Sequence, residues 1–234
     1  MPGARSRDTF PRKFTAQSSK ISVSPCPVGR WDNAFNHEGH QSVDKMTDNT
    51  ASFSPSDFLA RLSRPIFDER VELRGTQYLF EGRESPCRNG ILRFTPDDSY
   101  SSGNFQKLRD MHGQLQLDSA TGTDAQRKTI LERTNWPAEF FKDKLILECG
   151  CGAGPDTEAL VKLGAIVVSV DIAGVDVAKR NVGSGDRNMF VQASIMDLPF
   201  RKESFDIVYC HRVLQHTPDP EATLKHILQY VKPD

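Results

Sequence analysis

Short apolar runs that alternate with helical patterns constrain this chain most, and they occupy residues 141–234. The runs at 145–147 and 166–170 each end at an acidic residue, Glu148 and Asp171. Strands that alternate with helices form βαβ units, in which the strands lie parallel in one sheet and the crossovers are right-handed. The pattern therefore predicts an α/β fold with a Rossmann-like, doubly wound parallel sheet.

Four strands can be identified, and helical patterns separate them. The strands end near Glu148, Asp171, Gln192 and Cys210. Helices are predicted over residues 157–163, from Gly174 onward and over 220–231. The last helix carries apolar residues three and four positions apart, which predicts a buried face made of Leu224, Ile227, Leu228 and Val231.

A glycine-rich turn follows the first predicted strand and precedes the first helix. It reads Glu148-Cys-Gly-Cys-Gly-Ala-Gly154. Glycine adopts backbone angles that other residues avoid, and its missing side chain lets a ligand approach the main chain. Asp171 closes the next strand 17 residues after Gly154, where a carboxylate can accept both hydroxyls of a ribose. The turn predicts a nucleoside site, and a turn that needs glycine for packing alone is the alternative.

A dinucleotide site is the obvious competitor for this turn. A G-x-G-x-x-G motif that starts at Gly150 requires glycine at position 155, where this chain has Pro155. Proline also removes a backbone donor from the start of the helix, where a pyrophosphate would bind. The turn therefore favours a ligand without phosphate groups over a nicotinamide, flavin or nucleotide-sugar ligand.

Four motifs follow one another in order after residue 141. The first two are Leu145-Ile-Leu-Glu-Cys-Gly-Cys-Gly-Ala-Gly154 and Val168-Ser-Val-Asp171, and the others lie at 190–200 and 204–220. In order and spacing they resemble the class I S-adenosylmethionine-dependent methyltransferases, above all the small-molecule branch that includes quinone-ring methyltransferases. The resemblance implies methyl transfer from S-adenosylmethionine to a small organic acceptor.

The resemblance assigns cofactor contacts to the glycine-rich turn. Gly150, Gly152 and Gly154 would line the methionine and ribose portion, and Cys151 would sit beside the ligand. Glu148 would accept hydrogen bonds near the amino group of the cofactor, directly or through water.

Later motifs supply the other expected contacts. Asp171 would hold the ribose hydroxyls, and Ile172 and Ile195 would lie against the adenine. Ser194 stands where the family commonly has Asp, and its hydroxyl would meet the exocyclic amine. Cys210, at the end of the fourth strand, completes the expected cofactor-binding set.

Two histidines follow the fourth strand and are the candidate catalytic residues. His211 and His216 lie where the carboxyl ends of parallel strands place ligands. Histidine titrates near neutral pH, so either ring is a candidate base for a hydroxyl acceptor. The alternatives are that His216 packs locally and His211 only lines the cofactor, and a carbon or nitrogen acceptor would need no base.

The cysteines do not predict a metal site. Cys149 and Cys151 form a C-x-C pair without the further ligands that zinc requires, and Cys26 and Cys87 lack C-x-x-C partners. We therefore expect no metal. An odd count of 5 cysteines without an export signal points to a reducing, cytoplasmic location.

Charge and hydropathy narrow the range of partners. The 30 basic and 31 acidic residues argue against a dedicated nucleic-acid partner, and no apolar stretch reaches the length of a membrane span. Residues 1–55 are polar and rich in Ser, Pro and Gly, so we expect a disordered tail, with a transit peptide as the alternative.

Residues 56–140 are expected to form a helical and irregular lead-in to the methyltransferase domain at 141–234. Ser56 is the expected helix cap, and the segments 76–80 and 90–94 are the expected short strands.

The family resembled here has seven strands, of which four are found, so we expect a domain truncated at its C-terminus. The strand that ends at Cys210 should form an exposed sheet edge, open to a missing segment or a protein partner. A non-catalytic cofactor-binding or interaction module is the alternative function.

Overall fold

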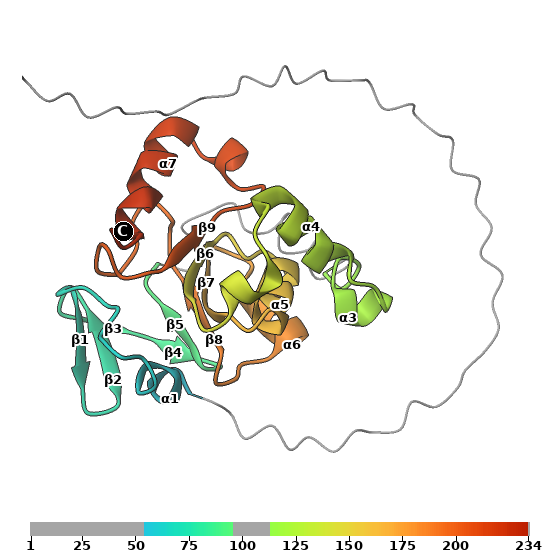
Figure 1. Ribbon diagram of the computed structural model, residues 1–234. Helices are drawn as coiled ribbons and strands as arrows, with labels where there is room; N and C mark the ends of the chain where they lie inside the picture. Colours follow the sequence, from blue (N-terminus) through green and yellow to red (C-terminus); the bar gives the residue numbers. More distant parts are fainter. Residues whose placement is uncertain (1–53, 96–112, 234) are drawn as a thin grey trace, which may run out of the picture. The chain divides into compact units, whose positions relative to one another are not determined.

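The computed structural model describes residues 54–95 and 113–233 (Figure 1). All of them belong to one compact unit, Asp48–Asp234. The expected disordered tail at 1–55 lies outside the described residues, except for its last two. Within the described part, no helix combines the length and apolar character that crossing a bilayer requires.

A six-stranded sheet organises the described residues, with the strand order β4-β5-β8-β7-β6-β9. Its strands are β4 (Cys87–Arg88), β5 (Ile91–Arg93), β6 (Leu145–Cys149), β7 (Ile166–Asp171), β8 (Asn188–Gln192) and β9 (Ile207–Tyr209). The four predicted strands are β6 to β9, and all neighbours among them are parallel. The predicted α/β fold with a Rossmann-like sheet is confirmed.

Helices α5 (Pro155–Lys162) and α6 (Val175–Val182) connect the first three of these strands, as the sequence predicted. A lead-in of α3 (Asp118–Thr121) and α4 (Ala125–Thr134) precedes β6, and α7 (Pro220–Ile227) follows β9. Short 3₁₀ turns lie at Ala138–Phe141, Leu214–His216 and Leu228–Tyr230.

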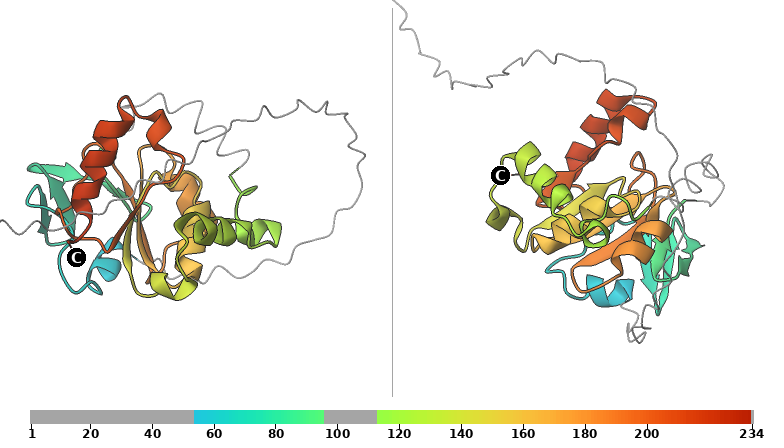
Figure 2. Two further views of the ribbon diagram at one scale, coloured as in Figure 1. Left: turned by 45° about the horizontal axis from the view of Figure 1, so that its top comes forward. Right: turned by 90° about the vertical axis from the view of Figure 1, so that its right-hand side faces the viewer.

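The two faces of the sheet carry separate apolar cores, because successive strand residues point to opposite faces. Ile146 and Val167 pack with Leu160 of α5 on one face. Leu147 and Val168 pack on the other face with a core that includes Ile227 of α7. Figure 2 accordingly shows α5 and α7 on opposite sides of the sheet.

The lead-in contributes more strands than its sequence suggested. A separate antiparallel sheet consists of β1 (Val71–Arg74), β2 (Gln77–Phe80) and β3 (Arg83–Ser85). The predicted strand at 90–94 is β5, and it does not stay apart from the main sheet: it pairs in parallel with β8, with Leu92 opposite Val191. The sheet therefore has six described strands instead of the four expected.

Helix α1 (Pro55–Leu59) begins two residues earlier than predicted. Ser54, and not Ser56, is its cap, because the Ser54 hydroxyl accepts a hydrogen bond from the Asp57 amide and the Asp57 carboxylate accepts one from the Ser54 amide. The Ser56 hydroxyl instead lies 3.0 Å from the Tyr78 hydroxyl.

The buried face of the last helix also differs from the prediction. Leu224 and Leu228 are 41% and 54% exposed, whereas Thr223, Ile227 and Tyr230 are buried. The α-helix ends at Ile227, and a 3₁₀ turn follows it. Because a 3₁₀ turn has fewer residues per turn, the buried side chains shift by about one position from the predicted apolar face.

A buried arginine attaches β5 to the sheet. Arg93 is 7% exposed, and its Nη2 and Nη1 atoms donate to the carboxylate of Asp176 in α6 at 2.7 and 3.0 Å. The same Nη1 donates to Gln192 Oε1 of β8 at 2.7 Å, and Gln192 Nε2 donates to the carbonyl of Ile172 at 3.0 Å. The lead-in is thereby linked to the loop that follows Asp171.

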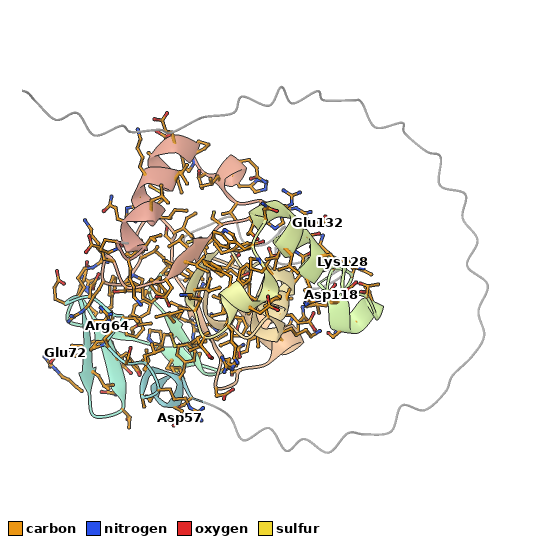
Figure 3. All side chains as sticks on the ribbon, in the orientation of Figure 1. Asp57, Arg64, Glu72, Asp118, Lys128 and Glu132 are labelled. Atoms are coloured by element: carbon orange, nitrogen blue, oxygen red, sulfur yellow. The ribbon has the colours of Figure 1, made fainter. Side chains whose placement is uncertain are left out.

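We predict that Arg93→Met lowers the free energy of unfolding by about 1–3 kcal/mol, because Asp176 and Gln192 lose their charged donor in a poorly hydrated place. Urea unfolding measures the loss. Arg74→Met is the matched control: Arg74 also binds a carboxylate through two nitrogens, but its partner Glu72 points into solvent (Figure 3). That variant should unfold like the wild type, and equal losses in both would contradict the prediction.

Candidate cofactor-binding site

A cavity of about 590 Å³ lies where the carboxyl ends of the parallel strands meet. Residues after β6, β7, β8 and β9 contribute to its wall, and Gly113, Gln116 and Gln126 of the lead-in complete it. This is the usual ligand position in open parallel sheets, and the volume suits a small organic ligand. Of the predicted site residues, the cavity wall includes Gly150, Cys151, Gly152, Asp171, Ile172, Ser194, Ile195, His211 and His216.

The glycine-rich turn brings bare main chain to the cavity. Gly150 and Gly152 have φ angles of +83° and +58°, in the left-handed region that favours glycine. A side chain at Gly150 would also meet Val213, since a Cβ there would lie 2.3 Å from Val213 Cγ2. Both glycines therefore line the cavity, and Gly150 also packs closely against Val213.

Gly154 has a different environment from the other two. It is buried outside the cavity wall, and a Cβ there would lie 2.8 Å from Val182 Cγ2 and 3.2 Å from the Ala178 Cα of α6. Gly154 is the residue before helix α5 and has a φ of +92°. The structure thus places Gly154 at a close contact with α6, as in the alternative in which the turn needs glycine for packing.

Asp171 stands on the cavity wall and is held there by backbone donors. Its Oδ2 accepts from the Gly152 amide at 2.9 Å, and its Oδ1 accepts from the Ala173 and Gly174 amides at 2.8 Å each. These bonds join the glycine-rich turn after β6 to the loop after β7. A carboxylate can accept about four hydrogen bonds, so a sugar hydroxyl bound here would share its oxygens with these amides.

A tight turn that follows β8 forms this part of the cavity wall. The Ser194 hydroxyl accepts from the Met196 amide at 3.2 Å, and the Asp197 amide donates to the Ser194 carbonyl at 3.0 Å. The carboxylate of Asp197 points elsewhere and binds Arg70 at 2.6 Å. Ile195 and Ile172 supply the apolar surface of this part of the cavity.

Glu148 lies beneath the turn and does not line the cavity. Its Oε2 accepts from the hydroxyls of Thr157 and Ser169 at 2.6 Å each. Burial, followed by the negative charge of Asp156, raises the pKa of Glu148 to about 7, against the opposing effect of the two hydroxyl donors. The structure therefore gives Glu148 a supporting position behind the turn.

The cysteines near the site are free thiols in this part of the chain. Cys151 lines the cavity, whereas Cys210 faces away from it and packs against the apolar core. Burial raises the pKa of Cys210 to about 11 and the pKa of Cys149 well above its ordinary value. Among the described residues, no group of three or more His, Cys, Asp or Glu side chains is arranged to hold a metal ion.

The two candidate histidines have different surroundings. His216 is exposed in the 3₁₀ turn, whereas the His211 side chain is only 10% exposed. His211 Nδ1 lies 3.0 Å from Oδ2 of Asp156, in the first turn of α5. Sequence reasoning missed Asp156, and its position directly after Pro155 at the start of a helix is the signal that was available.

Comparisons with known proteins match the part of the chain that carries the four motifs. The sequence model of a family described as "Methyltransferase domain" matches residues 147–234. A ubiquinone biosynthesis O-methyltransferase of Coxiella burnetii is 37% identical over 96 residues, which are 40% of this chain and 41% of that protein. The protein of the same name from Saccharophagus degradans is 35% identical over 95 residues, 39% of this chain and 40% of that protein.

This chain therefore spans about two fifths of the length of these curated relatives. Among solved structures, the YcgJ protein of Bacillus subtilis aligns with a TM-score of 0.40 at 23% identity, over 47% of each chain. The sequence matches confirm the resemblance drawn from the motifs.

The buried carboxyl of Glu148 should make stability depend on pH. Its folded pKa of about 7 exceeds the ordinary 4.5, so its contribution is full below pH 4.5 and is lost as the pH rises through about 7. Relative to Glu148→Gln, the wild type should lose on the order of 3 kcal/mol of unfolding free energy between pH 4.5 and about pH 8.

Urea unfolding of both proteins at several pH values measures this difference. Glu132→Gln, at an exposed position of α4, is the control and should follow the wild type at every pH. A constant gap between the wild type and Glu148→Gln across this range would show that Glu148 is not the titrating group.

Proposed function

We propose that this chain, whose residues 147–234 match the family model described as "Methyltransferase domain", binds S-adenosylmethionine in the cavity and transfers its methyl group to a small organic acceptor. The observation that carries the proposal is the juxtaposition of bare glycine main chain and the Asp171 carboxylate on one cavity wall. Such a wall fits an uncharged sugar and not a pyrophosphate.

In this proposal the residues of the cavity wall contact different parts of the cofactor. Gly150, Cys151 and Gly152 lie along the methionine and ribose portion, and Asp171 accepts the sugar hydroxyls. The apolar side chains of Ile172 and Ile195 enclose the adenine, with the Ser194 turn beside it. When bound, S-adenosylmethionine supplies a methyl group on a positively charged sulfur.

Three of the expected contact residues act from behind the wall. Glu148 holds the Thr157 hydroxyl at the start of α5, and Gly154 permits α6 to pack closely. Cys210 fills the core under the end of β9. Their effect on the ligand would pass through the positions of the glycine-rich turn and of the strands.

The acceptor is proposed to be a small molecule. The curated relatives named above are ubiquinone biosynthesis O-methyltransferases, which supports an acceptor of that kind. A formal net charge of −1 favours such an acceptor over nucleic acid. The free thiols of the described residues are compatible with a cytoplasmic, reducing location.

A cofactor-binding or interaction module without turnover is the second candidate function. The observation that favours it is β9, which pairs with β6 on one side and with no other strand among the described residues on its second side. Such an edge is a site for strand addition. Cofactor binding without methyl transfer to any acceptor would favour this second function.

Calorimetry with two ligands tests the cofactor assignment. S-adenosylmethionine should bind and NAD should not, because Pro155 removes a donor that a pyrophosphate needs. Binding of NAD alone, or of neither ligand, would reject the proposal.

Asp171→Ala should weaken S-adenosylmethionine binding by about 1–3 kcal/mol, because hydrogen bonds to a carboxylate are lost from the ligand and from the Gly152, Ala173 and Gly174 amides. The dissociation constant is measured by calorimetry, and urea unfolding checks that the variant is folded. Asp186→Ala, outside the cavity wall, is the control. An unchanged dissociation constant in Asp171→Ala would remove the sugar site from this wall.

A further inference from the structure

A histidine–carboxylate pair forms part of the cavity wall next to the proposed cofactor contacts. His211 follows β9, and Asp156 lies in the first turn of α5, 55 residues earlier in the chain. Their side chains are only 10% and 13% exposed, and His211 Nδ1 lies 3.0 Å from Asp156 Oδ2. In this position the carboxylate accepts a hydrogen bond from Nδ1–H and leaves Nε2 as the basic nitrogen of the ring.

The second ring nitrogen is buried without a partner. His211 Nε2 has no hydrogen-bond partner among the described residues. Leaving a buried polar atom unsatisfied costs about 1–3 kcal/mol, so such atoms are few in folded proteins and call for an explanation. A ligand that donates a hydrogen bond to Nε2 provides an explanation, because binding of that ligand would satisfy the nitrogen.

Other side chains hold Asp156 in place. The Gln126 amide nitrogen donates to Asp156 Oδ1, and the Tyr209 hydroxyl lies 3.4 Å from the same oxygen. Burial, and then the charge of Asp156, raises the pKa of Tyr209, so Tyr209 stays a neutral donor. The carboxylate thus has donors on one oxygen and the histidine on the other.

Gln126 is itself fixed by a buried acid of the lead-in. The carboxylate of Asp118, labelled in Figure 3, accepts from the backbone amides of Gln126 and Arg127 at 2.9 and 3.0 Å. These are orphan donors of the first turn of α4, and the residue before this helix makes no side-chain cap. Asp118 therefore caps α4 from a distance and sets the position of Gln126.

We propose that His211, oriented by Asp156, accepts a proton at Nε2 from a hydroxyl group of the methyl acceptor. This assignment rests on the proposed function and adds the acceptor class, an alcohol or phenol. Asp156, Gln126 and Tyr209 are positioning residues, and His211 is the catalytic base.

The proton and electron balance of the step is complete without a further reactant. The acceptor oxygen forms a bond to the methyl carbon, the carbon–sulfur bond breaks with its electrons returning to sulfur, and the hydroxyl proton moves to Nε2. The ring becomes a cation beside Asp156 and later releases the proton to water. A neutral hydroxyl is a weak nucleophile and gains from such a base, whereas a carbon or amine acceptor has less need of one.

The charges around the pair suit a transient imidazolium. Asp156 faces the ring from α5, and Tyr209 faces it from β9. Asp156 is therefore the acidic group that contacts the ring and provides the counter-charge for the proton that the ring accepts in this step.

Nitrogen NMR of ¹⁵N-histidine-labelled protein tests the pair without turnover. With S-adenosylhomocysteine present and at alkaline pH, the wild type should carry its proton on Nδ1 of His211, with Nε2 bare. Asp156→Ala should shift the tautomer ratio about 10- to 100-fold toward Nε2–H, the scale of a lost hydrogen bond to a charged group. His211→Gln assigns the signal, and His216→Gln is the matched control that should leave it unchanged.

Phenol and anisole then test the proton acceptor, because they share a ring and differ in the hydroxyl proton. Phenol should move the Nε2 resonance toward the hydrogen-bonded range, and anisole should not. A wild-type ring protonated on Nε2, or an Nε2 resonance that phenol leaves unmoved, overturns the assignment.

Calorimetry on the same samples separates this proposal from the previous one. S-adenosylhomocysteine should bind the wild type, Asp156→Ala and His211→Gln with dissociation constants within about twofold of one another, since the pair serves the acceptor. Absence of binding in all three would reject the proposed function and the assignment with it, whereas binding in all three together with an Nε2 resonance that phenol leaves unmoved would reject the assignment alone.

Discussion

The candidate site depends on the hydrogen bonds that the Asp171 carboxylate accepts from backbone amides. The carboxylate accepts backbone hydrogen bonds from the turn after β6 and from the loop after β7, and so fixes two neighbouring strand ends to each other. The parallel register of β6 and β7, with Cys149 opposite Val170, makes this possible because it brings both carboxyl ends to one edge. Gly150 and Gly152 of the turn lie on the cavity wall, with Gly150 packed closely against Val213, whereas Gly154 packs against α6.

Three carboxyl groups surround this turn, and their surroundings give them different roles. Asp171 is held by backbone amides at the cavity wall, and Asp156 pairs with His211 in the same wall. Glu148 is fully buried behind them, and burial, followed by the charge of Asp156, raises its pKa to about 7. Burial thus distinguishes Glu148 from the two acids of the cavity wall.

The lead-in takes part in the site although it precedes the parallel strands in the chain. Arg93 of β5 connects through Gln192 to the Ile172 carbonyl beside Asp171. Gln126 of α4 reaches Asp156 from the other side. The lead-in therefore extends the sheet at one edge and also supports both halves of the cavity wall.

The sequence by itself determined the four parallel strands, the helices between them and the glycine-rich turn near Asp171. These features depend on residue periodicity and on backbone angles that glycine alone adopts readily, and both are local properties of the chain. Tertiary structure decided the rest: the pairing of β5 with β8, the packing role of Gly154, the buried face of α7, and the meeting of Asp156 with His211. Each of these depends on which surfaces of distant segments come into contact, and sequence spacing carries no direct record of that.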